Sequence, residues 1–351
     1  MSDQQIPVNS SVDKEDIPSD ERGPFSLGQR LRQPRTLISF GLAIAIIVFV
    51  VRGLDIDLAT TWQYMRSADP WLLVAGLIVF YLTFPLRAFR WRMLLINAGV
   101  PVQAGKYSWA SFSALIEYIY LSWFANCIVP AKLGDAYRGY LLKHNGDVSF
   151  SATFGTIFAE RLLDMIGLFG LLVISGYLTF GAQMPEGTQI VFGFGGLLIV
   201  VIISGLIGMR WLGPQIRWFI PNRLHRVYGN FEQSALRSFT PVILPRLFLL
   251  TGSIWLLEGF RLWFVIQSLS YTGLNLTLAA IIFVALASSL LTALPVTPAG
   301  LGVVEGTITV VLTFFGIASS LGSAVTLLDR LINFWSIVVF GFILYLFSRR
   351  K

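Results

Sequence analysis

Cysteine, histidine and charged residues are all scarce in this chain of 351 residues. Its one cysteine is Cys127, and its two histidines are His144 and His225. A single cysteine cannot form an internal disulfide, and one cysteine with two distant histidines argues against a Cys/His metal site. No Walker A sequence is found, which argues against ATP hydrolysis. We therefore expect neither a cofactor nor a bound metal.

The low charge content excludes most soluble classes of protein. Only 13% of the residues are charged, whereas a soluble chain carries about 25%, and 55% are apolar with a mean hydropathy of +0.71. A soluble enzyme, a DNA-binding domain and a secreted disulfide scaffold are excluded. Several apolar runs approach the length of about 20 residues that spans a bilayer. The composition indicates a polytopic, all-α membrane protein.

Nine apolar segments follow a polar tail. The tail, residues 1–36, has too few large apolar groups to fold, and we expect it to be disordered. The apolar segments are residues 37–54, 71–86, 107–129, 150–181, 189–209, 247–270, 276–294, 303–318 and 331–347. We predict about eight full transmembrane helices and one re-entrant segment.

The distribution of lysine and arginine predicts the orientation. These residues gather in the tail, in 87–106, 130–150 and 210–246, and at the C-terminus. The positive-inside rule places all five regions, and both termini, on the cytoplasmic side of the inner membrane. Because 87–106 and 130–150 then share a side, 107–129 must be re-entrant. The segment 210–246 mixes arginines with aromatic residues, which indicates an interfacial segment on anionic lipid rather than a nucleic-acid site.

Two short motifs recur about 168 residues apart. Residues 130–134 (PAKLG) match 298–302 (PAGLG), and Glu160-Arg161 matches Asp329-Arg330. An apolar span follows the second PAxLG motif, whereas a polar stretch follows the first. We therefore predict halves of about 37–209 and 247–351 in opposite orientations, an arrangement common in transporters. Two unrelated Pro/Gly breaks are the alternative.

Charges within the apolar segments mark the candidate site, because each costs at least about 2.5–3.5 kcal/mol on insertion scales. We predict that cationic side chains contact an anionic lipid headgroup, that neighbouring acids line the same cavity, and that the PAxLG backbone breaks the helices there. The predicted headgroup contacts are Lys132, Arg138, Arg161 and Arg330. The predicted cavity acids are Asp135, Glu160, Asp164, Glu305 and Asp329. The backbone positions are Pro130, Gly134, Pro298, Gly300 and Gly302.

Other charged groups have simpler interpretations. Glu258 and Arg261, three residues apart, are interpreted as a structural ion pair. Asp55 and Asp57 follow the first span, where membrane-embedded glycosyltransferases place acids. Asp57 is also a good N-cap for a short helix from residue 58, which is the favoured interpretation.

The motifs resemble those of a known family, the flippase-like transmembrane domain of lysylphosphatidylglycerol synthases, which also forms stand-alone UPF0104 membrane proteins. The resemblance rests on Pro130-x-x-x-Gly134-Asp135-x-x-Arg138, Glu160-Arg161-x-x-Asp164 and Thr297-Pro298-Ala299-Gly300-Leu301-Gly302-x-x-Glu305, and it covers residues 37–351. Family members often have Glu at the position of Asp135 and Gly at that of Ala299.

The resemblance implies a protein that moves aminoacylated phosphatidylglycerol or a polyprenyl-phosphate lipid between leaflets. No counterpart of the soluble aminoacyl-transferase domain of the synthases is present, so synthase activity is not expected. Two alternatives stay open: a glycosyltransferase that uses a lipid-phosphate sugar donor, and a non-transporting partner of a lipid-modifying enzyme.

Overall fold

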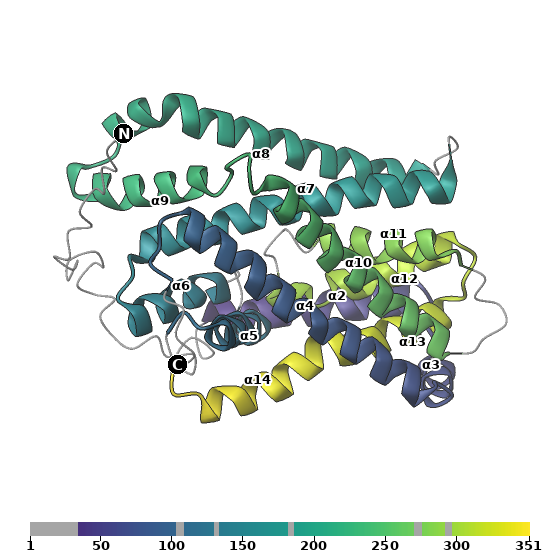
Figure 1. Cartoon of the computed structure of the whole chain (residues 1–351). Helices are drawn as coiled ribbons and strands as arrows, with labels where there is room; N and C mark the ends of the chain where they lie inside the picture. Colours follow the sequence, from purple (N-terminus) through teal and green to yellow (C-terminus); the bar gives the residue numbers. More distant parts are fainter. Residues whose placement is uncertain (1–33, 103–108, 130–132, 182–185, 270–275, 292–296) are drawn as a thin grey trace.

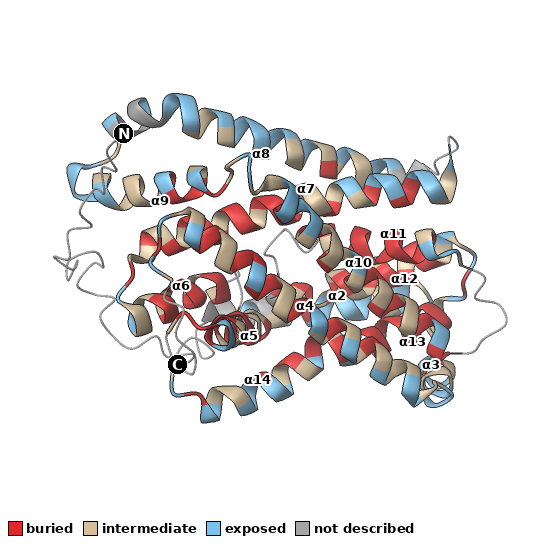
Figure 2. Cartoon of the chain, viewed as in Figure 1, coloured by how far each residue is buried: buried red, intermediate tan, exposed pale blue. Residues whose placement is uncertain are grey.

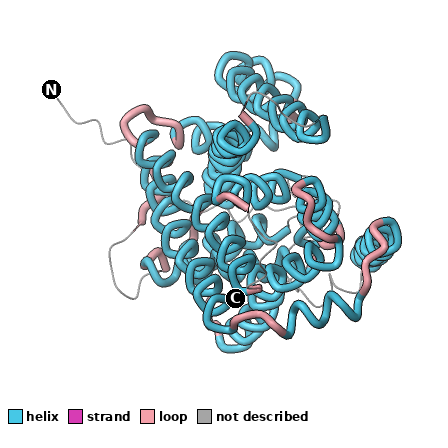
Figure 3. Tube along the Cα trace, turned by 90° about the vertical axis from the view of Figure 1, so that its right-hand side faces the viewer, coloured by secondary structure: helices cyan, strands magenta, loops and turns pink. Residues whose placement is uncertain are grey.

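The computed structural model describes residues 34–102, 109–129, 133–181, 186–269, 276–291 and 297–351. Within these ranges every regular element is a helix (Figure 3), so the predicted all-α membrane fold is confirmed. The predicted disorder of the tail concerns residues that lie almost wholly outside these ranges. Pro130 and Lys132 also lie outside them.

Thirteen α-helices follow one another along the described residues. They are α2 (Pro34–Gly53), α3 (Leu58–Arg66), α4 (Pro70–Asn97), α5 (Phe112–Ile128), α6 (Leu133–Gly146), α7 (Phe150–Phe180), α8 (Glu186–Phe219), α9 (His225–Arg237), α10 (Leu244–Ser268), α11 (Leu278–Leu291), α12 (Val303–Phe314), α13 (Ser319–Arg330) and α14 (Ser336–Phe347). Short 3-10 turns lie at Asn222–Leu224 and Pro298–Gly300. A π-helical turn, Leu331–Trp335, joins α13 and α14 into one rod.

Four of the described helices are long and apolar enough to cross a membrane: α4, the part of α8 over Gln189–Leu212, α10, and the rod Ser319–Phe347. α7 has 31 residues, which gives a length of roughly 46 Å. The last span therefore begins at Ser319 and not at residue 331 as predicted, because the π-turn continues the helix rather than ending it. α4 also extends eleven residues beyond the predicted end at 86.

α5 and α6 form a re-entrant hairpin. At its closed end the Gly134 N–H donates to Asn126 Oδ1 at 2.8 Å, and at its open end Gly146 lies against Trp109. α6 has 14 residues and spans roughly 21 Å, less than the bilayer core of about 30 Å. α5, within the predicted segment 107–129, is thus one arm of the hairpin. α6 is the returning arm, and it lies within the polar stretch 130–150 that was predicted as a cytoplasmic loop.

α11 and α12 form a second hairpin of the same kind. They have 14 and 12 residues, or roughly 21 and 18 Å. The described parts of the predicted full spans 276–294 and 303–318 are therefore arms shorter than the bilayer core of about 30 Å, and the described residues contain fewer than eight full-length spans. Apolar composition alone does not separate a half-length arm from a full span, because both are buried in apolar surroundings.

The two hairpins open toward opposite ends of the bundle. α7 begins at the open end of the first, where Phe150 packs on Gly139, and ends at Phe180, which stacks on Phe315 beyond α12. α4 and α10 are antiparallel neighbours, since the Asp69 N–H donates to the Ser268 carbonyl. Figure 1 shows α5 and α6 at one end and α11 to α13 at the other.

Each half of the inverted repeat is a long helix, a hairpin and a second long helix. The first half contains α4 to α7, and the second contains α10 to α14. The inversion arises because α8 crosses once between them. The predicted reason, one additional crossing at 303–318, was wrong.

Both described ends of the chain lie at the same end of the bundle. Glu117 near the start of α5 accepts from Ser348 at 2.6 Å and from Arg350 at 2.5 Å. α2 runs alongside α12, with Ile46 near Gly302 and Val50 near Gly306, so Pro34 lies toward the C-terminal end. Which leaflet this end faces stays a prediction.

Three of the arginines that the sequence analysis placed in cytoplasmic loops lie inside the helix bundle. Arg87 and Arg90, counted in a basic loop, lie within α4 and are buried, as is Arg138 within α6. Carboxylates inside the bundle compensate them, so they carry no information on orientation.

α8 lies at the edge of the molecule, and Figure 2 shows it largely exposed along its length. It packs on α7 and α9. Trp211 and Trp218 are exposed near its end, and α9 covers α7, with Phe231 against Gly155. The placement of 210–246 on an anionic lipid surface stays a prediction.

The opposed hairpins predict a labelling pattern. Cysteines placed at the exposed positions Pro101 and His144 should be protected from an impermeant external reagent, and cysteines at Thr277 and Ala318 should be labelled. Native Cys127 is buried and serves as the unlabelled background. Labelling of only one residue of either pair would contradict the hairpins.

The closed end of the first hairpin predicts a stability effect. A Cβ at Gly134 would lie 2.0 Å from the Ser122 carbonyl oxygen, whereas one at Gly252 meets nothing within 4 Å. We expect Gly134→Ala to destabilise by about 1–3 kcal/mol or more through overpacking. Thermal melting in detergent checks this, with Gly252→Ala as control. Equal melting temperatures would show that the hairpin is not closed this tightly.

Candidate functional site

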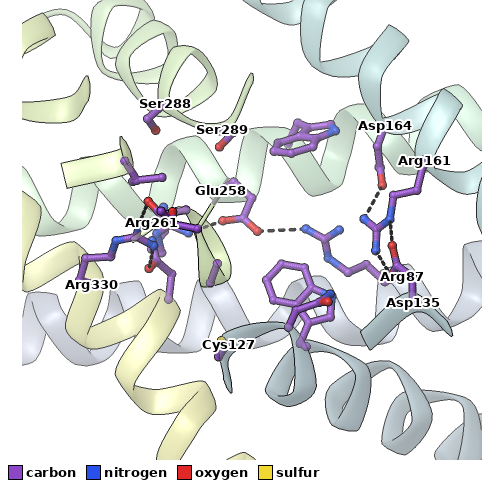
Figure 4. Close-up of a pocket in the computed structure, with 18 of the residues that line it drawn as sticks. Arg87, Cys127, Asp135, Arg161, Asp164, Glu258, Arg261, Ser288, Ser289 and Arg330 are labelled. Atoms are coloured by element: carbon purple, nitrogen blue, oxygen red, sulfur yellow. Dashed lines mark hydrogen bonds and ion pairs between the residues drawn. The ribbon is translucent and has the colours of Figure 1, made fainter. Parts of the chain in front are cut away.

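A cavity of about 210 Å³ lies where the two hairpins meet the long helices. It is lined from α4, α5, α7, α10 and α11, from the tips of both hairpins, and from the π-turn. Figure 4 shows charged side chains on both sides of it. The charged lining residues are Arg87, Asp135, Arg161, Asp164, Glu258, Arg261 and Arg330.

The first half contributes a cluster of three arginines and three carboxylates. Arg90 lies 3.1 Å from Glu160 and 2.7 Å from Asp164, and Arg138 lies 2.8 Å from Glu160; all four side chains are at most 2% exposed. Arg161 binds Asp135 through two hydrogen bonds of 2.7 and 2.8 Å. The side chain of Arg161 is 30% exposed, more than any other in the cluster.

The second half repeats this arrangement. Arg261 donates to both oxygens of Asp329, at 2.8 and 3.2 Å, and pairs with Glu258. Arg330 lies 2.8 Å from Glu305 and donates to the Gly300 carbonyl at 3.2 Å. With Arg87, this cluster also has three arginines and three carboxylates.

The ion pairs of the two halves correspond. In each half an arginine from the first long helix binds an acid of the repeated motif: Arg90 binds Glu160, and Arg261 binds Asp329. In each half the motif arginine binds an acid just beyond the hairpin tip: Arg161 binds Asp135, and Arg330 binds Glu305. The sequence match between the motifs of the two halves thus extends to matching ion pairs in the structure.

Glu258 joins the clusters. It lies 3.0 Å from Arg87 of the first half and also pairs with Arg261 (Figure 4). Arg90 adds a second link, a 2.8 Å hydrogen bond to Thr251 on α10. Positive and negative charges balance across the two clusters, so the cavity is not strongly electropositive. An anion would have to share arginines with carboxylates already bound to them.

The structure divides the predicted site residues by depth. Asp135, Asp164, Arg161, Arg330 and Gly300 line the cavity. The other four charged residues support these from behind and are not part of the lining: Arg138, Glu160, Glu305 and Asp329. Arg138 is 1% exposed, and its guanidinium lies 4.5 Å from the Trp91 ring centroid. Arg138 was predicted to contact the headgroup, but Glu160 and Trp91 enclose its side chain and keep it out of the cavity lining.

The backbone N–H of Gly302, one of the predicted backbone positions of the site, already has a partner within the chain. Gly302 has a φ of 83° and its N–H donates to Glu305 Oε2 at 2.7 Å. Glu305 therefore caps its own helix. Pro298 lies in the 3-10 turn of the hairpin tip.

Sequence reasoning missed two functional candidates, and for two other residues it predicted the ion pair but not their place in the cavity lining. Arg87 and Arg90 were assigned to a loop, although their spacing of three residues directly after an apolar run could have indicated one face of a continuing helix. Glu258 and Arg261 do form the predicted ion pair, but they also line the cavity.

Asp57 caps α3, as predicted, and does not line the cavity. It accepts from the Ala59 N–H at 2.9 Å and from the Thr60 hydroxyl at 2.5 Å. The hydrogen bond from Thr60 is the main cause that holds the pKa of Asp57 below its ordinary value, followed by the backbone N–H groups.

Comparison with known proteins identifies relatives over most of the chain. The family described as "Lysylphosphatidylglycerol synthase TM region" matches residues 36–341. The chain is 39% identical over 228 residues to UPF0104 membrane protein MJ1078 of Methanocaldococcus jannaschii, covering 65% of this chain and 95% of that protein. It is 24% identical over 342 residues to UPF0104 membrane protein PH1989 of Pyrococcus horikoshii, covering 90% and 97%.

A further relative carries an enzyme name. The chain is 27% identical over 164 residues to "Glycosyltransferase AglD" of Haloferax volcanii. The match covers 46% of this chain and 25% of that protein, so three quarters of the glycosyltransferase lie outside it.

The burial of the two arginines of the first half predicts different stability effects. Arg90→Gln leaves Glu160 and Asp164 buried with one fewer cation, and we expect a loss of about 3–5 kcal/mol. Arg161→Gln should cost less, because water reaches its side chain and that of Asp135, which is 12% exposed. Melting temperatures in detergent compare the two. A larger loss for Arg161→Gln would contradict the assigned burial.

Proposed function

Because the chain belongs to the lysylphosphatidylglycerol synthase TM region family, we propose that it translocates a phosphate-bearing lipid between the leaflets of the cytoplasmic membrane. The substrate would be a phospholipid of the aminoacylated phosphatidylglycerol type or a polyprenyl phosphate. The observation that carries the proposal is the cavity with paired charges between two inverted, re-entrant hairpins. Inverted repeats around a midplane site are typical of transporters that open alternately to the two sides.

The size of the cavity supports a headgroup rather than a whole lipid. Ligand pockets usually measure about 300–1,000 Å³, and this one measures about 210 Å³. A phosphate with a small attached group would occupy it. The acyl or prenyl chains would stay in the bilayer, in contact with the exposed apolar side chains of the outer helices.

Because positive and negative charges in the cavity balance, a headgroup would bind by replacing a carboxylate partner of an arginine and not by a general attraction to positive charge. A headgroup phosphate that binds Arg161 would replace part of the bidentate contact with Asp135. Arg161 is the first expected contact, because it is the most exposed arginine of the two clusters. The equivalent pair Arg330–Glu305 would act in the same way when the cavity opens toward the other side.

A glycosyltransferase is the second candidate function, favoured by the relative AglD. Its predicted acids are Asp55 and Asp57. Asp57 is bound to the first turn of α3 and away from the cavity, which counts against a catalytic role. A non-transporting partner subunit of a lipid-modifying enzyme is a third candidate, and it predicts that the purified chain moves no lipid.

Translocation in reconstituted vesicles tests the proposal. Wild-type protein should move a fluorescent phosphatidylglycerol from the inner leaflet to a position where an external quencher reaches it. Arg161→Gln should move it roughly 10-fold more slowly or worse, because one charge-assisted contact is lost. Arg330→Gln should also lose translocation, with a larger loss of stability because its side chain is only 8% exposed.

The matched control is the double variant Asp55→Asn, Asp57→Asn, which leaves the cavity intact and should translocate normally. Normal transport by folded Arg161→Gln and Arg330→Gln would contradict the role of the charged cavity in transport, and no transport by the wild-type protein would contradict a flippase. Loss of function in the Asp55, Asp57 variant would instead favour the glycosyltransferase.

A further inference from the structure

Three described residues that line the cavity have a buried polar atom with neither a hydrogen-bond nor an ion-pair partner: Arg87 (Nε), Trp255 (Nε1) and Thr297 (Oγ1). Arg87 is 2% exposed and Thr297 is 5% exposed. Buried polar groups are almost always paired, so orphaned ones indicate a missing partner. The three residues come from α4, from α10 and from the tip of the second hairpin.

The chemistry of these atoms specifies the missing partner. An arginine Nε and an indole Nε1 can only donate, and a threonine hydroxyl can donate as well as accept. A ligand that satisfied all three would therefore present several acceptor oxygens. Arg330 Nε makes no hydrogen bond either, but it lies 2.8 Å from Glu305 in an ion pair. The remaining orphaned polar atoms of the described residues, such as Tyr118 Oη and Ser323 Oγ, belong to residues outside the cavity lining.

Among the arginines that line the cavity, Arg87 has the weakest charge compensation. Arg90, Arg161 and Arg261 each pair with two carboxylates. Arg87 pairs with Glu258 alone, and Glu258 is shared with Arg261. Its residual positive charge favours an anionic acceptor over a neutral one such as a sugar hydroxyl.

Arg87 is held in place for such a ligand. Its guanidinium lies 4.7 Å from the centroid of the Trp123 ring, a cation–π contact, while Nη2 is fixed at 3.0 Å from Glu258. Figure 4 shows this guanidinium extending toward the middle of the cavity between Glu258 and the Arg161–Asp135 pair. Binding of a ligand would therefore require little further ordering of the Arg87 side chain.

We infer that Arg87, Trp255 and Thr297 form a subsite for a phosphate group at the centre of the cavity. The identification of that phosphate as a lipid headgroup rests on the proposed function. The subsite is separate from the Arg161–Asp135 and Arg330–Glu305 pairs, whose donors already have carboxylate partners. A phosphate would contact those pairs on entering and leaving, and would rest against Arg87 between these steps.

Three substitutions remove the donors with little change of shape. Trp255→Phe keeps an aromatic ring and loses the N–H, and Thr297→Val replaces the hydroxyl by a methyl group. Arg87→Gln leaves Glu258 paired with Arg261. Tyr118→Phe and Ser323→Ala are matched controls, because each removes a buried, unpartnered hydroxyl outside the cavity lining.

Calorimetric titration of the detergent-purified chain in phosphate-free buffer compares three probes: dihexanoyl-phosphatidylglycerol, dihexanoylglycerol and inorganic phosphate. We expect the phospholipid to bind wild type and both controls equally, and to bind each of the three subsite variants roughly 10-fold more weakly or worse. Dihexanoylglycerol should bind much more weakly than the phospholipid, because it lacks the phosphate.

The outcomes separate this inference from the proposed function. Unchanged phospholipid affinity in folded Trp255→Phe and Thr297→Val overturns the subsite, and so does equal binding of dihexanoylglycerol or no binding of either phosphate probe. Inorganic phosphate that binds with the same dependence on the three donors supports the subsite. If wild-type vesicles then move no lipid, the subsite stands and the flippase function fails.

Discussion

Mutual compensation of buried arginines and carboxylates is the constraint on which this structure depends. Apolar helices gain little from contacting one another in a bilayer, because lipid is as apolar as their side chains. The pairs Arg90–Glu160, Arg261–Asp329 and Arg87–Glu258 supply the missing specificity, since each joins two helices and would be costly to break. They fix α4 against α7, α10 against α13, and the two halves against each other.

The hairpins are tolerated because protein covers their tips. Irregular backbone survives at membrane depth only where it is enclosed or lines a cavity. α2 covers the second tip, with Ala43 and Ile46 so near Gly302 that a Cβ there would lie 2.9 Å from each. α14 packs along the first hairpin, with Gly341 against Phe124. α2, which lies outside the repeat, and α14, which lies at its end, thus cover the helix breaks that border the cavity.

A neutral but charged cavity suits a carrier of a charged headgroup. A cavity with excess positive charge would hold a phosphate too firmly to release it, and an apolar cavity would not admit one. Here each arginine of the lining keeps a carboxylate to which it can return. Arg161 with Asp135 and Arg330 lie on opposite sides of Arg87 (Figure 4), so a phosphate that approached from either side would meet an arginine of an equivalent ion pair.

Composition and motif spacing determined the membrane class, the all-α fold, the family and the motif arginines Arg161 and Arg330, because long apolar runs and short repeated motifs are local properties of the chain. The tertiary structure alone decided which apolar segments cross fully. Segments 276–294 and 303–318 resemble spans in composition, yet their described helices, α11 and α12, are arms shorter than the bilayer core that neighbouring helices cover. It also decided the partners: Arg87 and Arg90 resemble loop cations by position, whereas acids 70 or more residues away hold them inside the bundle. Long-range charge pairing leaves no local signal, since it depends on which helices become neighbours.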